Sequence, residues 1–169
     1  AGQIRLRAQA SSRDDEGLAL TDVDRTSWRS TISWVPQSPT LVPGTILDNM
    51  GDLPQRNLDE AARATGFDAV LASTPDGWNS TIGSGGVGLS VGQRQRLALT
   101  RALAARSQVV VLDEPTAHLD AVSEETVVRA IQAMREEGRT VIVIAHRNAI
   151  IEVADTIIDV AHADEEALA

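Results

Sequence analysis

The chain has 169 residues, enough for one domain with a buried core. Hydrophobic residues make up 43% of it and are mostly aliphatic, with one Phe, three Trp and no Tyr, which suits parallel strands buried on both faces. The net charge of −9 argues against nucleic acid as a partner, because nucleic-acid binding depends on a basic surface. Cysteine is absent, which excludes disulfides, thiol catalysis and cysteine-metal sites.

All fifteen basic residues are Arg, so any mechanism that requires a lysine from this chain is excluded. The longest apolar runs, residues 109–112 and 141–145, are far shorter than the ~20 residues that span a bilayer. No signal peptide is visible. These features are compatible with the cytoplasm.

The N-terminal third predicts two short strands. Ile4–Arg7 alternates apolar and basic residues, and a polar loop follows at Gln9–Gly17. Thr31–Val35 is the second predicted strand, and Pro36 ends it.

Residues 46–105 are expected to form a mainly helical insertion. The chain is predicted to turn helical after Pro43-Gly44, and Asn57 is predicted to start a helix that Gly66 ends. A glycine-rich loop follows at Gly83–Gly88. Ser90 is expected to cap a helix over Ser90–Ala104, with Gln93 closing the capping box.

The second half alternates strands and helices. The predicted strands are Val109–Leu112, Thr140–Ala145 and Thr156–Val160. One helix is predicted over Ser123–Glu137, with Val127, Ile131 and Met134 buried on one face and Gly138 as its stop. A second, short helix is predicted from Asn148. This order predicts an α/β fold with a parallel sheet and right-handed crossovers. The tail at 161–169 is polar and is expected to fray.

Two adjacent carboxylates, Asp113 and Glu114, end the predicted strand Val109–Leu112. Ligands of parallel α/β sheets sit at this end of the strands. One carboxylate is suited to hold Mg²⁺, and the other to orient and deprotonate a water molecule for phosphoryl transfer. A solvated turn after a buried strand explains the same pair.

The pentapeptide Leu89-Ser90-Val91-Gly92-Gln93 follows the glycine-rich loop and opens a helix. Its backbone N–H groups and the helix dipole can face an anion, and Gly92 allows a phosphate to approach the backbone. An ordinary capping box is an equally good explanation of the pentapeptide taken alone.

Five elements in this order resemble the ABC ATPases over roughly residues 2–160. W-V-P-Q, with Gln37, resembles the Q-loop, and L-S-V-G-Q-R-Q-R-L-A-L-T-R-A-L resembles the signature helix. V-V-V-L-D-E-P-T-A-H-L-D resembles Walker B running into the D-loop at Asp120, and V-I-V-I-A-H-R resembles the switch strand with His146. The resemblance implies a P-loop NTPase (RecA-like) parallel sheet core with an inserted helical ABC subdomain.

By resemblance, Glu114 polarises the attacking water and His146 contacts the γ-phosphate of ATP. Asp113 and Gln37 serve Mg²⁺, and Gln37 also links the site to a membrane partner. The residues expected to bind the nucleotide across a dimer of two such domains are Leu89, Ser90, Val91, Gly92, Gln93 and Asp120, with Gln37 on the chain's own side.

The resemblance divides the chain into four parts: a core part with the Q-loop (1–45), a helical subdomain (46–105), a core part with Walker B, D-loop and switch histidine (106–160) and a tail (161–169).

A P-loop, G-x-x-x-x-G-K-[ST], does not occur in this sequence. The chain is expected to begin just beyond the helix that the P-loop opens. Alone, it is therefore expected to bind ATP weakly and not to hydrolyse it.

The resemblance points to the exporter branch, on the cytoplasmic face of the inner membrane and beside a transmembrane domain. Val91, where Gly is commoner, is similar to the CydD/CydC-type thiol exporters of cytochrome bd biogenesis, which suggests a small thiol as substrate. The chain departs from the exporter pattern at two places. Ser84 stands where exporters tend to have Glu, and residues 160–163 replace the D-G-x-I strand that usually follows at Asp159.

Two other functions fit the same residues. DNA-repair and chromosome ATPases of this superfamily insert coiled coils between Q-loop and signature, but Gln37 and Leu89 are only 52 positions apart (89 − 37). A non-enzymatic module that only supplies a signature surface to a partner is the second alternative. Intact Glu114 and His146 favour ATP hydrolysis by the complete protein.

Overall fold

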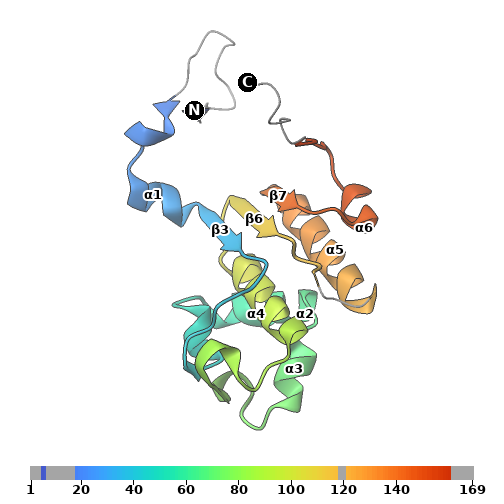
Figure 1. The fold of residues 1–169 in the computed structure, drawn as a ribbon. Coiled ribbons are helices and arrows are strands. Elements are labelled where there is room, and N and C mark those ends of the chain that lie inside the picture. The colour runs from blue at the N-terminus through green and yellow to red at the C-terminus, as the bar shows by residue number, and fades with distance from the viewer. Residues whose placement is uncertain (1–4, 7–17, 118–120, 161–169) are drawn as a thin grey trace, which may run out of the picture.

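The computed structural model describes residues 5–6, 18–117 and 121–160. Its centre is a parallel sheet of three strands in the order β3 (Ile32–Val35), β6 (Val109–Asp113) and β7 (Thr140–Ile144). Figure 1 shows the three arrows side by side, with helices below and behind them. The α/β class and the three strands are therefore confirmed, with ends that differ by one residue each.

The core lies on one face of this sheet. Val35, Val110 and Leu112 are almost completely buried, and α4 (Val91–Ala104) contacts β3 while α5 (Ala121–Glu136) contacts β7. The predicted inner face of α5 is confirmed, since Val127, Ile131 and Met134 are all buried. Alternation of side chains along each strand explains why every second strand residue enters this core.

The opposite face of the sheet is apolar and exposed. Trp34, Val111 and Ile142 are in register across the three strands, and Trp34 and Ile142 are 62% and 51% exposed. Ile144, which is 55% exposed, continues this surface. No helix among the described residues covers this face in Figure 1.

The segment between β3 and α4 is mainly helical but contains a small antiparallel ribbon. Its elements are β4 (Gly44–Thr45), η2 (Leu47–Met50), α2 (Gln55–Ala64), α3 (Asp68–Ser73), η3 (Gly77–Asn79), β5 (Thr81–Ile82) and η4 (Ser84–Gly86). β4 pairs with β5, so the prediction of helix directly after Pro43-Gly44 is wrong there. The extended conformation of Gly44–Thr45 depends on backbone pairing with a strand almost forty residues away, and the local sequence does not indicate such a pairing.

The start of α2 also differs from the prediction. The helix begins at Gln55 after Pro54, and Asn57 lies inside its first turn. The Asn57 side chain donates to the carbonyl oxygen of Ala104 at 3.2 Å, so it joins α2 to the end of α4 instead of capping its own helix. The predicted stop is confirmed: Gly66, at φ 66°, follows the C-cap.

Four further elements lie in the N-terminal part of the chain. β1 (Arg5–Leu6) pairs antiparallel with β2 (Leu18–Ala19), and η1 (Leu20–Asp22) leads into α1 (Arg25–Ser30). Only β1 falls within a predicted strand, whereas β2, η1 and α1 were not predicted. The local signal for α1 is Asp24, whose carboxylate accepts a hydrogen bond from the backbone N–H of Ser27 at 2.7 Å.

The C-terminal part confirms one prediction and overturns another. The helix predicted from Asn148 is α6 (Asn148–Ile151). The strand predicted at Thr156–Val160 does not form, because none of the described strands lies beside this segment to complete a hydrogen-bond ladder. Ile157 and Ile158 instead border a hollow with Val141 and Val143 of β7. None of the helices in the described ranges is long and apolar enough to cross a bilayer.

Candidate functional site

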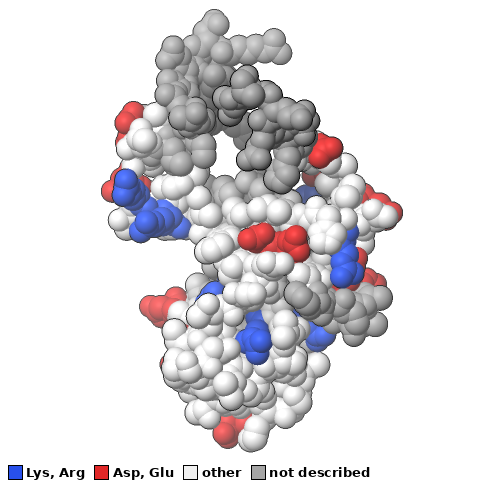
Figure 2. All heavy atoms as spheres, in the orientation of Figure 1, with Lys and Arg blue, Asp and Glu red and all other residues white. Residues whose placement is uncertain are grey.

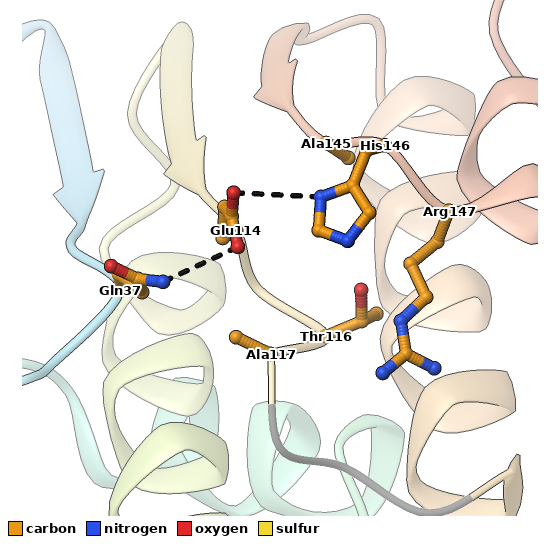
Figure 3. A pocket seen from close by; sticks show the side chains of 7 residues that line it. All are labelled: Gln37, Glu114, Thr116, Ala117, Ala145, His146 and Arg147. Atoms are coloured by element: carbon orange, nitrogen blue, oxygen red, sulfur yellow. Dashed lines mark hydrogen bonds and ion pairs between the residues drawn. The ribbon is translucent and has the colours of Figure 1, made fainter.

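The carboxyl ends of β3, β6 and β7 meet at one edge of the sheet. Gln37 follows β3 by two residues, Glu114 directly follows β6, and His146 follows β7 by two residues. Together with Thr116, Ala117, Ala145 and Arg147 these residues line an open pocket of about 290 Å³. Figure 3 shows Gln37 and His146 pointing at Glu114 from opposite sides.

Glu114 is the centre of this arrangement. Gln37 Nε2 donates to Glu114 Oε2 at 3.3 Å, and His146 Nδ1 lies 3.5 Å from Glu114 Oε1. The side chains of Glu114 and His146 are 32% and 74% exposed. One carboxylate is therefore held between an amide and an imidazole and remains open to water, as a general base that activates a water molecule must be.

The backbone at Glu114 has an unusual conformation. Its N–H continues the sheet ladder by donating to Ile144 O at 2.9 Å, yet its φ of 44° lies in the left-handed region. The Ala117 N–H then donates back to the Glu114 carbonyl at 2.9 Å. Left-handed non-glycine residues are uncommon, and strained backbone clusters at functional sites. The tight turn aims the Glu114 side chain into the pocket.

Asp113 is separated from Glu114 by the alternation of the strand. It is the last residue of β6, half-buried, in register with Ile144, and it does not line the pocket. The two adjacent carboxylates thus leave the strand in different directions, which is consistent with two different roles.

The predicted signature turn is built as a reciprocal capping box. The Gln93 N–H donates to Ser90 Oγ at 3.2 Å, and the Ser90 N–H donates to Gln93 Oε1 at 2.8 Å. Leu89 is buried, whereas Val91 is 53% exposed. The capping-box prediction is confirmed, and the turn lies apart from the pocket around Glu114.

Arginines on the signature helix bind backbone carbonyl oxygens. Arg94 donates to Leu89 O at 2.8 Å, and Arg101 donates to Asn49 O at 3.2 Å. Burial lowers the pKa of Arg101 from its ordinary value. These contacts fix the glycine-rich loop and η2 against α4.

The oxygen atoms of Gln37 and Asp113 suit a share of a magnesium ligand set. Gln37 uses its Nε2 on Glu114, which leaves its Oε1 as an acceptor, and Mg²⁺ prefers carboxylate and amide oxygens together with phosphate oxygens and water. Nowhere in the described residues do three or more His, Cys, Asp or Glu side chains gather. Phosphate and water oxygens would share a magnesium site here with protein oxygens.

The sequence comparison that decides the family covers most of the chain. The family model described as "ABC transporter" matches residues 1–117. This chain belongs to the ABC transporter family. The ABC resemblance drawn from Gln37, the signature and the Walker B strand is confirmed at this level.

Curated relatives and a solved structure agree with this assignment. The chain is 39% identical over 146 residues to "ABC multidrug transporter MDR5" of Trichophyton rubrum and 38% identical over 152 residues to "ABC-type transporter atr1" of Mycosarcoma maydis. These alignments cover 83% and 85% of the chain but only 11% of each relative. A bacterial Atm1-family ABC exporter solved with ATP bound matches with a TM-score of 0.75 and 31% identity, over 82% of this chain and 25% of that one.

The ABC transporter assignment places the chain in the P-loop NTPase fold class. The predicted D-loop residue Asp120 lies outside the described residues. The pocket adds Thr116 and Arg147, which the sequence did not single out. Arg147 directly follows His146, and this adjacency was the signal available for it.

Proposed function

We propose that this chain is the ATP-hydrolysing part of an ABC exporter. The observation that carries the proposal is the contact of Glu114 with Gln37 and His146 at the carboxyl edge of the sheet. Membership of the ABC transporter family supports it. The chain spans about a tenth of its curated relatives, so the rest of the transporter lies in other parts of such a polypeptide or in partners.

Glu114 is the general base in this proposal. Its carboxylate orients a water molecule and accepts its proton, while His146 holds the γ-phosphate from the other side of the pocket. Asp113 and Gln37 would hold Mg²⁺ through oxygen atoms. A bound Mg²⁺ supplies neutralisation of the charge on the phosphate oxygens. The distances of 3.3 and 3.5 Å around Glu114 support these roles.

The signature turn acts on the nucleotide of a second ABC domain. Ser90 Oγ already accepts the Gln93 N–H, so its own hydroxyl hydrogen remains available for a γ-phosphate oxygen. Gly92 and the N-terminal dipole of α4 favour the same anion. Leu89 and Val91 flank the turn, and Asp120 contacts the second domain as the D-loop residue. The exposure of Val91 supports a contact surface here.

We divide the chain accordingly into a core part with the Q-loop (1–45), a helical subdomain (46–105), a second core part (106–160) and a tail (161–169). A transmembrane domain is the further partner, which places the chain on the cytoplasmic face of the membrane, the inner membrane in a bacterium. Nucleic acid is not expected as a partner in this proposal, because the net charge is −9. On the one face shown in Figure 2 the basic side chains lie at separate places.

The transported substrate is selected by the membrane domain. The relatives named above include a multidrug transporter, which supports export of the multidrug type. Export of a small thiol in cytochrome bd biogenesis, suggested by Val91, stays a prediction that the comparisons do not reach.

The experiment compares the 169-residue chain with a polypeptide that includes the upstream coding region. Nucleotide binding and phosphate release are measured for both. We expect weak binding and no hydrolysis for the chain alone, because no lysine reaches the phosphates. We expect turnover in the longer polypeptide, and its loss by about 10²–10⁴-fold in Glu114→Gln with binding retained.

The matched control is Glu152→Gln, an exposed glutamate outside the pocket, which should leave turnover unchanged. Ordinary hydrolysis by the chain alone, or a Glu114→Gln variant as active as the control, contradicts the proposal. A longer polypeptide that lacks a P-loop and does not hydrolyse ATP favours the non-enzymatic module that supplies only a signature surface.

A further inference from the structure

His146 is held in place mainly by the backbone that carries it. The connection between β7 and α6 has three residues, Ala145–Arg147. The His146 side chain is 74% exposed, and within the described ranges its polar side-chain partner is Glu114 at 3.5 Å. A mostly solvated ring with one long contact cannot fix its own position, so the ends of the connection must do so.

The start of the connection is anchored to the sheet. The carbonyl oxygen of Ile144, two residues before His146, accepts the Glu114 N–H at 2.9 Å. This bond keeps the end of β7 at the level of Glu114. It leaves the path of the chain after Ala145 undetermined.

The other end of the connection is anchored by Arg147. Its Nη1 donates to Glu124 Oε2 at 2.7 Å, and its carbonyl oxygen accepts the N–H groups of Ile150 and Ile151 in the first turn of α6. A charge-assisted hydrogen bond of this length is among the stronger polar contacts in proteins. Arg147 therefore fixes both the direction of α6 and the end of the connection.

Glu124 is a well-fixed partner. Its side chain is only 15% exposed and belongs to the first turn of α5, where the helix dipole favours a carboxylate. The same helix inserts Val127 and Met134 into the core, so Glu124 moves only with the core. Reduced exposure also limits screening of the ion pair by salt.

Arg147 lines the same pocket as Glu114 and His146, but its guanidinium binds Glu124. Figure 3 shows the His146 ring pointing toward Glu114 and the Arg147 side chain pointing away from it, along α5. Successive residues of the connection thus face opposite ways, one into the contact with Glu114 and one into the scaffold.

We propose that Arg147 and Glu124 are positioning residues: their ion pair holds the connection so that His146 Nδ1 faces Glu114. This inference rests on the proposed function, because it assigns to the pair the alignment of the two residues expected to act on ATP and water. Neither side chain touches the nucleotide in this scheme.

The test reads the tautomer of His146 in the 169-residue chain without nucleotide. A carboxylate beside Nδ1 favours the imidazole tautomer that carries its proton there. Nitrogen-15 spectra of the ring report this population, and His118 and His162 in the same sample serve as references. Glu114→Ala gives the signal of an uncoupled His146.

We expect Arg147→Ala and Glu124→Gln each to shift His146 to the Glu114→Ala signal while His118 and His162 stay unchanged. The charge swap Arg147→Glu with Glu124→Arg should restore the wild-type tautomer, which a general loss of stability would not do. Arg135→Ala, which removes the exposed pair with Asp155, is the matched control and should leave His146 as in the wild type.

A wild-type tautomer in both Arg147→Ala and Glu124→Gln overturns the inference. So does a charge swap that folds, by circular dichroism, without restoring the signal. Failure of the proposed function is seen separately, because Glu114→Gln would then leave ATP hydrolysis unchanged although the tautomer responds as expected. The two results are independent since the tautomer is measured without ATP.

Discussion

Gln37 and Glu114, 77 positions apart in the chain, are joined by a hydrogen bond of 3.3 Å across the carboxyl ends of β3 and β6. The register that pairs Val35 with Leu112 brings them together, since Gln37 lies two residues after Val35 and Glu114 two residues after Leu112. The Gln37 amide therefore orients the Glu114 carboxylate, which is proposed as the general base.

Replacing Gln37 by Ala removes the amide that orients Glu114 and a ligand oxygen for Mg²⁺. We expect turnover in a P-loop-containing polypeptide to fall about 10²-fold, the usual effect of misplacing a catalytic group. Steady-state phosphate release measures it. Gln108→Ala, an exposed glutamine outside the pocket, is the control. Equal rates for the two variants would show that the contact has no role in turnover.

Replacing Ser90 by Ala removes the acceptor for the Gln93 N–H at the start of α4. The chain should lose about 1 kcal/mol of unfolding free energy, as is usual for a lost N-cap. Urea denaturation followed by circular dichroism gives the value. Ser90→Thr keeps the hydroxyl and should lie close to the wild type. A Ser90→Ala midpoint equal to that of Ser90→Thr contradicts the prediction.

Gly85 and Gly86 differ in the space around them although both have positive φ, 66° and 81°. A Cβ at Gly86 would lie 2.5 Å from Arg94 Cδ and 3.0 Å from Leu41 Cδ1, whereas a Cβ at Gly85 meets nothing within 4 Å. We expect Gly85→Ala to cost about 1–2 kcal/mol for the left-handed backbone alone. Gly86→Ala should cost more.

The comparison of these two variants isolates the crowding. The Gly86→Ala side chain pushes on the Arg94 side chain, which bonds Leu89 O at the start of the signature turn. Backbone amide shifts at Leu89 and Ser90 should therefore change in Gly86→Ala and stay in place in Gly85→Ala. Equal stability and equal spectra would mean that Arg94 moves aside freely.

Thr65 and Thr100 form a buried polar contact between α2 and α4. Their hydroxyl oxygens lie 2.6 Å apart, and Thr65 Oγ1 and Thr100 Oγ1 also lie 2.9 Å from Ala61 O and 2.7 Å from Arg96 O. One hydroxyl donates to the other, which donates to the carbonyl of its own helix. Each single change to Val should cost about 1–3 kcal/mol, because it leaves the remaining hydroxyl short of one partner. The double change to Val should cost less than the sum.

A double-mutant cycle in urea measures this coupling, expected at about 0.5–1.5 kcal/mol for residues in direct contact. Thr74→Val provides a comparison, since its hydroxyl bonds the local carbonyl of Leu71 and is only half-buried. Strictly additive changes at Thr65 and Thr100 would show that the two hydroxyls do not depend on each other.

Short-range sequence patterns, and the order in which they follow one another, determined several helix and strand boundaries and the family of this protein. The strand ending in Asp113 and Glu114, the capping box of Ser90 and Gln93, and the stop at Gly66 depend on residues within a few positions of one another. Such signals act through backbone geometry and nearby hydrogen bonds, so one sequence reveals them. The order of five such elements indicated the family.

Only the tertiary structure decided which distant groups meet. Three contacts join residues 23 to 47 positions apart in the chain. They are the β4–β5 ribbon, the bond from Asn57 to Ala104 O and the pair of Arg147 with Glu124. None has a local pattern, because each depends on helices and strands that are first brought together by burial of the core. The absent strand at Thr156–Val160 has the same cause: its β-branched residues are suitable, but a strand exists only where a neighbour completes its hydrogen bonds.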